Sequence, residues 1–250
     1  MRLSLGTRRS LLHVAVRPAP LFAVAVLVGG PLAAVIAGER SSRDRPRERF
    51  SASMLLSNFS FPRKQSRDFH FALSGKLLFV VGYYSVTGYQ LYILTDYMKL
   101  DLAEAGALIG TIGLGTSLVF GFLAGPISDR IGRRKVLVIG SAILVAVATL
   151  LPFVFPYPWA MLLFALLGGI GNGVYNSVDQ ALNTEVLPSP DTAAKDLGIL
   201  NLANTGGQII GPGVTSGIVG LTGGYGVVFV AAAGVLVVAA FLIAPIRSVR

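Results

Sequence analysis

Long apolar runs separated by short polar or turn-rich connections dominate this sequence. A helix that crosses a bilayer needs about 20 apolar residues, and several of the runs reach that length. Turn-forming residues mark the connections: Pro152, Pro156 and Pro158 punctuate one of them, and "LTGG" at 221–224 marks another. The pattern predicts seven membrane-spanning helices, at about 20–38, 71–94, 103–127, 136–155, 159–182, 197–220 and 224–246.

The span at 159–182 carries the clearest polar pattern. Steps of three and four residues put Asn172, Asn176, Asp179 and Asn183 on one helical face, with Tyr175 beside it. Polar side chains are costly inside a bilayer, so this face is either a ladder of hydrogen bonds between helices or the wall of a water-filled cavity. We favour the cavity wall, while the sequence leaves the ladder open.

Two further spans carry polar stripes. Within 71–94, Lys76, Tyr83, Thr87 and Gln90 form one stripe, and Tyr89 belongs to the neighbouring one. Within 197–220, the residues that share a face are Asn201, Asn204 and Gln208.

The remaining spans differ from these three. The runs at 20–38, 136–155 and 224–246 are nearly all apolar, and we expect them to face lipid. The run at 103–127 has a stripe of small residues that permits close helix packing: Gly106, Gly110, Gly113, Ser117, Gly121 and Gly125. The fold class predicted is an all-α integral membrane protein, in which a helical bundle surrounds a polar path.

Composition narrows the functional class. The chain is 53% hydrophobic and 13% charged, whereas soluble domains contain about a quarter charged residues. It has no cysteine and only two histidines, both in basic, loop-like sequence. These residues offer no thiolate metal site and little material for a Ser-His-Asp triad. We therefore expect neither an enzyme nor a bound metal or cofactor.

Basic residues predict the orientation. A net charge of +9 can indicate nucleic-acid binding, but Lys and Arg also accumulate in the cytoplasmic loops of membrane proteins. The connections on one side hold many of them, while the opposite side, beyond residue 94, has Lys99 alone. This asymmetry places the loops 39–70, 128–135 and 183–196 and the C-terminus in the cytoplasm, and we expect no nucleic-acid partner.

The first part of the chain is expected to contain three segments. Residues 1–17 form a basic leader that we expect to be non-native or disordered, 18–38 a transmembrane helix, and 39–69 a basic cytoplasmic linker rich in Arg, Ser and Pro. A signal peptide ending near "VIAGE" is the alternative for the beginning. Its removal would place the basic linker outside the membrane, which the charge asymmetry opposes.

The connection "GPISDRIGRRK" at 125–135 resembles the loop motif of the major facilitator superfamily, G-x-x-x-D-R-x-G-R-R/K. The matching positions are Gly125, Asp129, Arg130, Gly132, Arg133 and Arg134. The stretch "LGILNLAN…Q" in 197–208 is also similar to the eleventh helix of glycoside and sucrose-type carriers in that family. These resemblances cover about residues 70–250.

The resemblance implies the family's helices 6 to 12: helix 6 at 18–38, and the six-helix C-terminal bundle at 70–250. In the family, helices 7 and 10 line the cavity, 8 and 11 flank it, and 9 and 12 face lipid, which matches the polar pattern above. Helices 1–5 are absent from the sequence, so we expect a truncated chain, or one that pairs with a missing N-terminal half or a second copy. The motif is expected to act in gating. Asp129 would cap the start of the family's helix 11, near residues 196–198, and Glu185 would pair with Arg133 or Arg134.

The predicted function is transport of a small polar solute, which could be sugar-like, across the plasma membrane by alternating access with proton coupling. The residues expected to bind the solute are Tyr89, Gln90, Asn172, Tyr175, Asn176, Asn204 and Gln208. Asp179 is the acid best placed for ion coupling or for pairing with Lys76. The alternatives are a non-transporting truncated protein or helper half-bundle, and drug efflux. A retinal-binding receptor would need a lysine in the last span, where none occurs.

Overall fold

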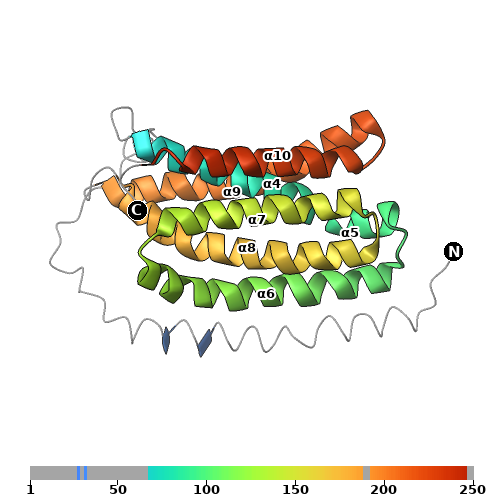
Figure 1. Ribbon diagram of the computed structural model, residues 1–250, viewed down its shortest axis with the longest axis horizontal. Helices are drawn as coiled ribbons and strands as arrows, with labels where there is room; N and C mark the ends of the chain where they lie inside the picture. Colours follow the sequence, from blue (N-terminus) through green and yellow to red (C-terminus); the bar gives the residue numbers. More distant parts are fainter. Residues whose placement is uncertain (1–26, 29–30, 33–66, 188–191, 247–250) are drawn as a thin grey trace. The chain divides into compact units, whose positions relative to one another are not determined.

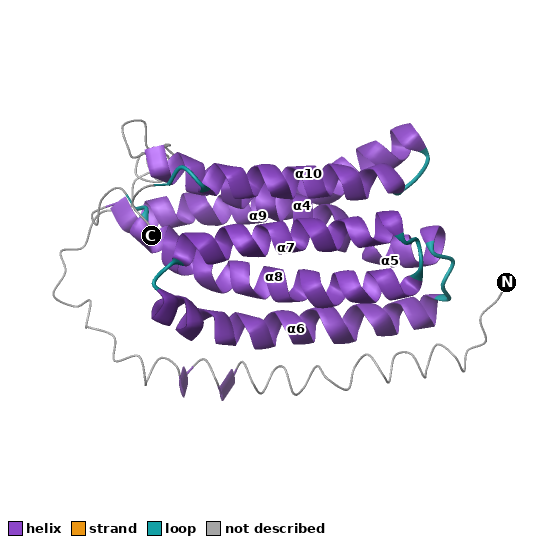
Figure 2. Cartoon of the chain, in the orientation of Figure 1, coloured by secondary structure: helices purple, strands orange, loops and turns teal. Residues whose placement is uncertain are grey.

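The computed structural model describes residues 27–28, 31–32, 67–187 and 192–246, without the side chains of 107–114, 129 and 131. The chain divides into two compact units, Met1–Ser51 and Ala52–Arg250. In the first unit, residues 27–28 and 31–32 are helical. The leader, most of the 18–38 helix and nearly all of the 39–69 linker predicted above lie outside the described residues. The second unit is helical wherever it is described, with turns between the helices (Figures 1 and 2).

Six long helices of the second unit correspond to the predicted spans from 71–94 onward. They are α4 Arg67–Thr87, α6 Leu102–Ile131, α7 Arg134–Val154, α8 Pro158–Glu185, α9 Ala193–Thr222 and α10 Gly226–Ile243. Among the described residues, four helical segments are long and apolar enough to cross a membrane: Arg67–Tyr97, α7, α8 and α10. The apolar part found in α6 is the shorter stretch Gly115–Ser128.

The predicted span 71–94 is interrupted in the structure. After α4 ends at Thr87, the chain turns through Gly88 and Tyr89 and continues as α5, Gln90–Tyr92, and a π-helix, η1, Ile93–Tyr97. Gly88 packs against Pro212 of α9, where an added Cβ would lie 2.8 Å from the Pro212 ring. The predicted span 71–94 thus lies within the candidate membrane span Arg67–Tyr97, and the break inside it was not part of the prediction.

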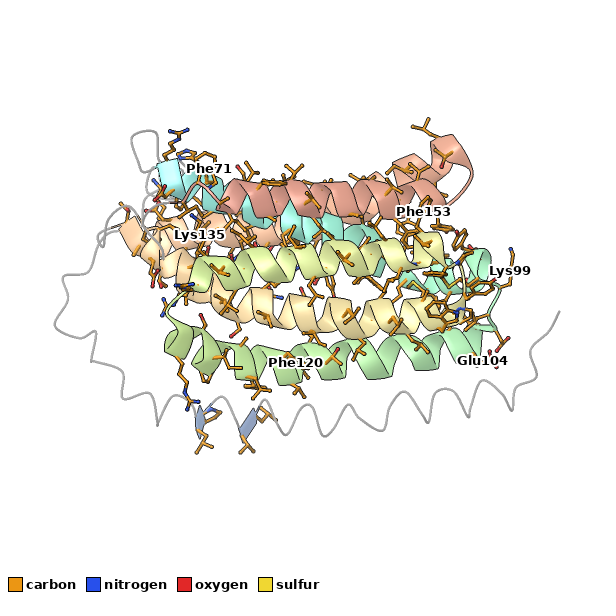
Figure 3. The ribbon with its side chains drawn as sticks, viewed as in Figure 1. Phe71, Lys99, Glu104, Phe120, Lys135 and Phe153 are labelled. Atoms are coloured by element: carbon orange, nitrogen blue, oxygen red, sulfur yellow. The ribbon has the colours of Figure 1, made fainter. Side chains whose placement is uncertain are left out.

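Helix packing follows a simple order: α9 packs on α4, α4 on α10, α10 on α7, α7 on α8, and α8 on α6. Helices α6 and α7 both pack extensively on α8 and touch each other little, although they are consecutive in the chain. Figure 1 shows the helices lying side by side, and Figure 3 places Lys99 and Glu104 at one end of the bundle and Phe71 and Lys135 at the other.

The apolar helices α7 and α10 each bury one side and expose the other, as expected for helices at a lipid boundary. In α10, Phe229 and Leu236 are fully buried, whereas Phe241 is 70% exposed. In α7, Val138 and Val145 are buried and Val147 is 54% exposed. This alternation gives both helices a packed face and an apolar outer face.

Small residues allow the closest helix contact, between α6 and α8. An added Cβ at Gly173 would lie 2.4 Å from the Ser117 carbonyl oxygen and 3.0 Å from the Gly121 backbone nitrogen, so no side chain fits there. Gly125 of α6 faces Ser177 of α8, while an added Cβ at Gly106 would meet no atom within 4 Å. The predicted small-residue stripe therefore packs on α8 through Ser117, Gly121 and Gly125; the side chains around Gly110 and Gly113 are outside the described ones.

Candidate functional site

A buried ion pair joins the two helices that carry the strongest polar stripes. Lys76 Nζ of α4 lies 2.8 Å from Asp179 Oδ2 of α8, and each side chain is 5% exposed. Asn183, one turn along α8, donates from Nδ2 to the same Oδ2 at 2.8 Å. Two donors thus converge on one carboxylate oxygen and hold the carboxylate in place.

Aromatic stacking seals the ion pair on one side. Tyr175, one turn before Asp179, stacks on Phe79, which lies one turn after Lys76, with ring centroids 3.5 Å apart and planes 2° apart. Both rings are 1% exposed and belong to the main apolar core. The sequence placed Tyr175 among the solute-binding residues, whereas the structure puts its ring in this core, next to the ion pair.

The predicted polar face of α8 divides into two parts. Asp179 and Asn183 are buried and form the hydrogen-bond ladder described above. Asn172 donates to Ser117 Oγ of α6 at 3.3 Å, and Asn176 donates to the Asn172 side-chain oxygen at 3.0 Å. Hydrogen bonds to other helices thus occur in both parts of the stripe, whereas Asn176 is exposed; the wall of a water-filled cavity stays a prediction.

The accessible part of this face borders a groove between α6 and α8. Its volume is about 360 Å³, and its lining residues are Ser117, Leu118, Gly121, Phe122, Gly173, Asn176 and Ser177. The groove runs beside the close crossing of the two helices at Gly121 and Gly173. Its polar groups, the Asn176 amide and the Ser117 and Ser177 hydroxyls, can donate and accept hydrogen bonds.

The other solute-binding candidates lie on α4 and α9. Gln208 is exposed and Asn204 half-buried on α9, while Tyr89 and Gln90 are half-buried at the break after α4. The structure does not gather these four around the groove between α6 and α8, because α9 packs on α4. Their role in solute binding stays a prediction.

Sequence reasoning missed how α4 and α9 are joined beside that break. Thr215 Oγ1 of α9 donates to the Ser85 carbonyl oxygen at 2.6 Å, and Ser85 Oγ lies 3.2 Å from the Gly211 carbonyl oxygen. Both side chains are buried. The sequence held no clear signal for these bonds, because the carbonyl that loses its helical donor to Pro212 is that of Gln208, four residues earlier, and not that of Gly211.

The 125–135 motif forms the end of α6 and the start of α7. Gly132 terminates α6 with φ of 64°, a left-handed conformation that favours glycine, and its N–H donates to the Ser128 carbonyl oxygen at 2.9 Å. Arg134 forms an ion pair with Glu185 at the end of α8, one of the two pairings expected from the sequence. The Asp129 side chain lies outside those described, so its capping role stays a prediction; Asp196, near the expected target, is buried and accepts a hydrogen bond from Thr192 Oγ1 at 2.7 Å.

Comparison with known proteins identifies a family that matches most of the second unit, and relatives that match parts of it. The family model of the Major Facilitator Superfamily matches residues 69–250. A gentisate transporter of Corynebacterium glutamicum is 28% identical over 147 residues, which cover 55% of this chain and 33% of the relative. A glucose transport protein of Synechocystis sp. is 33% identical over 107 residues, covering 42% of this chain and 21% of the relative.

A solved structure supports the fold. The crystal structure of a peptide transporter, POT, in complex with alafosfalin superposes with a TM-score of 0.66 at 14% sequence identity, covering 78% of this chain and 42% of that one. The matched part of the chain spans a third or less of the two curated relatives described above and less than half of the solved transporter.

Proposed function

The chain belongs to the major facilitator superfamily, and we propose that it moves a small polar solute across the plasma membrane by alternating access coupled to protons. Membership of this family and the transporter relatives point to a membrane transporter rather than an enzyme. The names of two relatives, for gentisate and for glucose, support a small solute rich in oxygen atoms. We propose that the C-terminus and the 39–70 loop are cytoplasmic, as the basic residues indicate.

The observation that carries the proposal is the buried Lys76–Asp179 pair, because it joins α4 to α8 at a position from which water is nearly excluded. Proton binding to the Asp179 carboxylate would cancel the attraction to Lys76 and leave an unpaired, buried ammonium group, which is costly. The helices would then favour an arrangement in which Lys76 contacts water or the solute. Release of the proton would restore the pair and the starting arrangement.

We propose that the solute meets polar groups of α8 first. Asn176 is exposed and borders the groove between α6 and α8, and Asn172 lies one turn away, held by Ser117. Tyr89, Gln90, Asn204 and Gln208 would contribute further hydrogen bonds from α4, α5 and α9. Tyr175 would act through the ion pair beside it, because its ring is buried against Phe79.

Gating would involve the 125–135 motif. The Arg134–Glu185 pair ties the start of α7 to the end of α8, so movement of α8 is transmitted to the motif. We propose that Asp129, Arg130 and Arg133 change partners between the two access states.

A second helical bundle would complete the path. Asn176, Gln180 and Gln208 are exposed polar side chains in helices that lie in a membrane, where lipid would not satisfy their hydrogen bonds. The partner would be an N-terminal half or a second copy of this chain. A half-bundle that assists another carrier is the second candidate, which the same exposed polar side chains of α8 and α9 would fit.

Solute exchange in proteoliposomes tests the proposed binding face. With labelled glucose and gentisate as probes, the full chain should exchange at least one of them. Asn176→Leu should reduce that exchange by about tenfold or more, since it removes hydrogen-bonding groups that the groove contributes. The matched control is Thr184→Val, on the same helix but outside the groove lining, where the hydroxyl donates to the Ala181 carbonyl oxygen. Equal exchange by Asn176→Leu and wild type would refute the assignment, while no exchange by any form would favour the helper role.

A further inference from the structure

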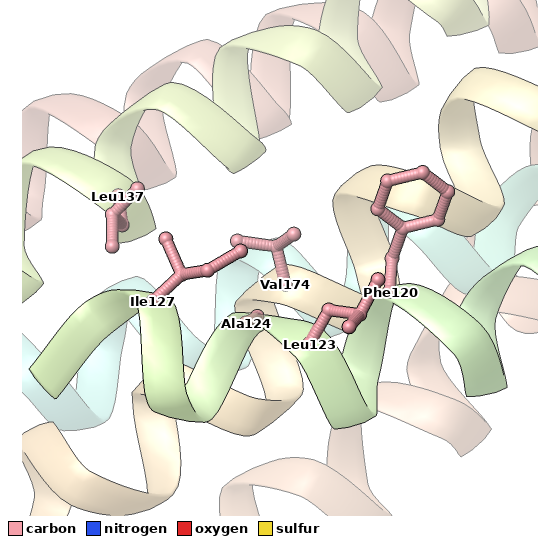
Figure 4. A pocket seen from close by; sticks show the side chains of 6 residues that line it. All are labelled: Phe120, Leu123, Ala124, Ile127, Leu137 and Val174. Carbon is pink, nitrogen blue, oxygen red and sulfur yellow. The ribbon is translucent and has the colours of Figure 1, made fainter. Parts of the chain in front are cut away.

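Contacts between helices are uneven across the bundle. An apolar pocket of about 100 Å³ separates α6 from α7, and its lining residues are Phe120, Leu123, Ala124, Ile127, Leu137 and Val174 (Figure 4). Helices α4 and α9, by contrast, approach closely: an added Cβ at Gly211 would lie 2.9 Å from the Ser85 nitrogen and 2.9 Å from the Val81 carbonyl oxygen. Side chains of α9 therefore reach the backbone of α4 directly.

This close contact coincides with the end of α4. In a continuous helix, the Tyr89 N–H would donate to the Ser85 carbonyl oxygen, four residues earlier. It donates instead to the Val86 carbonyl oxygen at 3.2 Å, and the chain turns. Thr215 Oγ1 of α9 donates to the Ser85 carbonyl oxygen at 2.6 Å. A hydroxyl from another helix thus bonds the carbonyl that the Tyr89 N–H would bond in an unbroken helix.

Thr215 uses its hydroxyl differently from an equally buried threonine, Thr149 of α7; both side chains are 0% exposed. Thr149 donates to the Val145 carbonyl oxygen of its own helix at 2.8 Å, a common arrangement for threonine within a helix. The Thr215 hydroxyl lies 3.3 Å from the corresponding carbonyl oxygen of α9, that of Gly211, and 2.6 Å from that of Ser85. Because a hydroxyl has one proton to donate, the shorter contact with α4 takes it.

The segment that follows the break has an unusual shape. Its second half, η1, is a π-helix, and Lys99 just beyond it has φ of 60°. Such features cost free energy locally, so contacts with other parts of the chain must stabilise them. Ile93 and Leu94 are fully buried and hold the middle of the segment, whereas the contact with α9 lies at its beginning.

We propose that Thr215 is a positioning residue, whose hydroxyl holds α4 in the broken form and thereby fixes the places of Tyr89 and Gln90. In the alternative, a continuous helix, the Tyr89 N–H recovers the Ser85 carbonyl and the side chains beyond it turn about the helix axis. In the broken form, the Tyr89 ring lies near that of Tyr225, with ring centroids 6.4 Å apart. Hydroxyl side chains satisfy freed backbone carbonyls where membrane helices are interrupted, which is the role assigned here to Thr215.

Distances between spin labels test whether Thr215 holds the break. The chain has no cysteine, so Leu91→Cys on α5 and Val230→Cys on α10, both exposed, can each carry one nitroxide label. The full chain in nanodiscs should give one main distance between the labels. Thr215→Val, which keeps the shape of the side chain and removes its donor, should shift this distance by several ångströms. Thr215→Ser, which keeps the hydroxyl, should give the original distance.

The matched control is Thr149→Val, which removes a hydroxyl of equal burial that bonds within its own helix, and it should leave the label distance unchanged. Thr215→Ala, which removes the same hydroxyl, serves if Thr215→Val does not fold. An unchanged distance in Thr215→Val, or an equal shift in Thr149→Val or Thr215→Ser, would overturn the inference.

Solute exchange in proteoliposomes separates this inference from the proposed function, because only the part that concerns Tyr89 and Gln90 as solute ligands rests on that function. Thr215→Val should raise KM for the exchanged probe, glucose or gentisate, about tenfold, as expected for the loss of about one hydrogen bond, and Thr215→Ser should restore it. A shifted label distance with wild-type KM would leave Thr215 as the residue that holds the break and would refute the solute-binding role of Tyr89 and Gln90. The label distances decide the role of Thr215 whether or not either probe is exchanged.

Discussion

Breaking the buried ion pair at one partner should destabilise the bundle strongly. Asp179→Ala leaves the Lys76 ammonium group, 4% exposed, without a carboxylate, and it removes the acceptor of the Asn183 amide. Among the described residues, Asp179 is the one acid in an ion pair with Lys76. The variant therefore creates an uncompensated buried charge and an unsatisfied buried donor at the same place.

The expected loss of unfolding free energy follows from the known behaviour of buried ion pairs. Removing one partner costs about 3–5 kcal/mol, whereas replacing both partners with apolar residues of similar volume is often neutral or stabilising. Lys76→Met with Asp179→Leu should therefore recover most of the stability that Asp179→Ala loses. The double variant separates the cost of a stranded charge from the value of the pair itself.

Thermal unfolding of the purified chain in detergent, followed by helical circular dichroism, measures this effect. Asp179→Ala should lower Tm by on the order of 10 °C, from roughly 2–4 °C per kcal/mol for a chain of this size. The control Asp96→Ala removes an exposed acid that accepts a hydrogen bond from the adjacent Thr95 hydroxyl, and it should change Tm little. A single variant with wild-type Tm, or a double variant as unstable as Asp179→Ala, would refute the reasoning.

Three further variants and one control test local features of the bundle by the same unfolding assay. Gly173→Ala should lower the free energy of unfolding by about 1–3 kcal/mol, because its Cβ would meet the α6 backbone. In the control Gly140→Ala, an added Cβ has no atom within 4 Å, so this change should be neutral or stabilising by up to about 1 kcal/mol. Equal effects of the two changes would contradict the close crossing. Gly132→Ala should cost about 1–2 kcal/mol because φ is 64° there, and an unchanged stability would argue against that turn. Arg134→Gln should cost less than about 1 kcal/mol, since its pair with Glu185 is partly exposed, and a larger loss would show that the pair is shielded from solvent.

The order and approximate limits of the helices could be predicted from the sequence. A long apolar run in a membrane has no water to bond its backbone N–H and C=O groups, so it must satisfy them within a helix. The helix break at Gly88 was not, because it depends on contact with Pro212, which is distant in sequence. Periodicity reports which residues share a face, and it carries no information about the neighbour that meets the face.

The same limit explains the outcome for the polar stripe of α8. Spacing put Asn172, Asn176, Asp179 and Asn183 on one face, and Asp179 was recognised as a partner for Lys76. Which members of the stripe are buried depends on the helices around α8: Asp179 meets Lys76 of α4 in the core, and Asn176 borders the groove beside α6. Tyr175 was assigned from its position beside the stripe, and the stacking on Phe79 was not apparent from sequence.

Solute-driven proton movement in proteoliposomes tests the central proposal most directly. Wild-type chain, with a pH-sensitive dye inside the vesicles, should acidify the lumen when an exchanged solute is added outside. Asp179→Asn, which keeps the size of the side chain and loses its charge, should still exchange the solute and should move no protons with it. Solute-driven acidification by Asp179→Asn at the wild-type proton-to-solute ratio would contradict the assignment of Lys76 and Asp179 as the coupling pair.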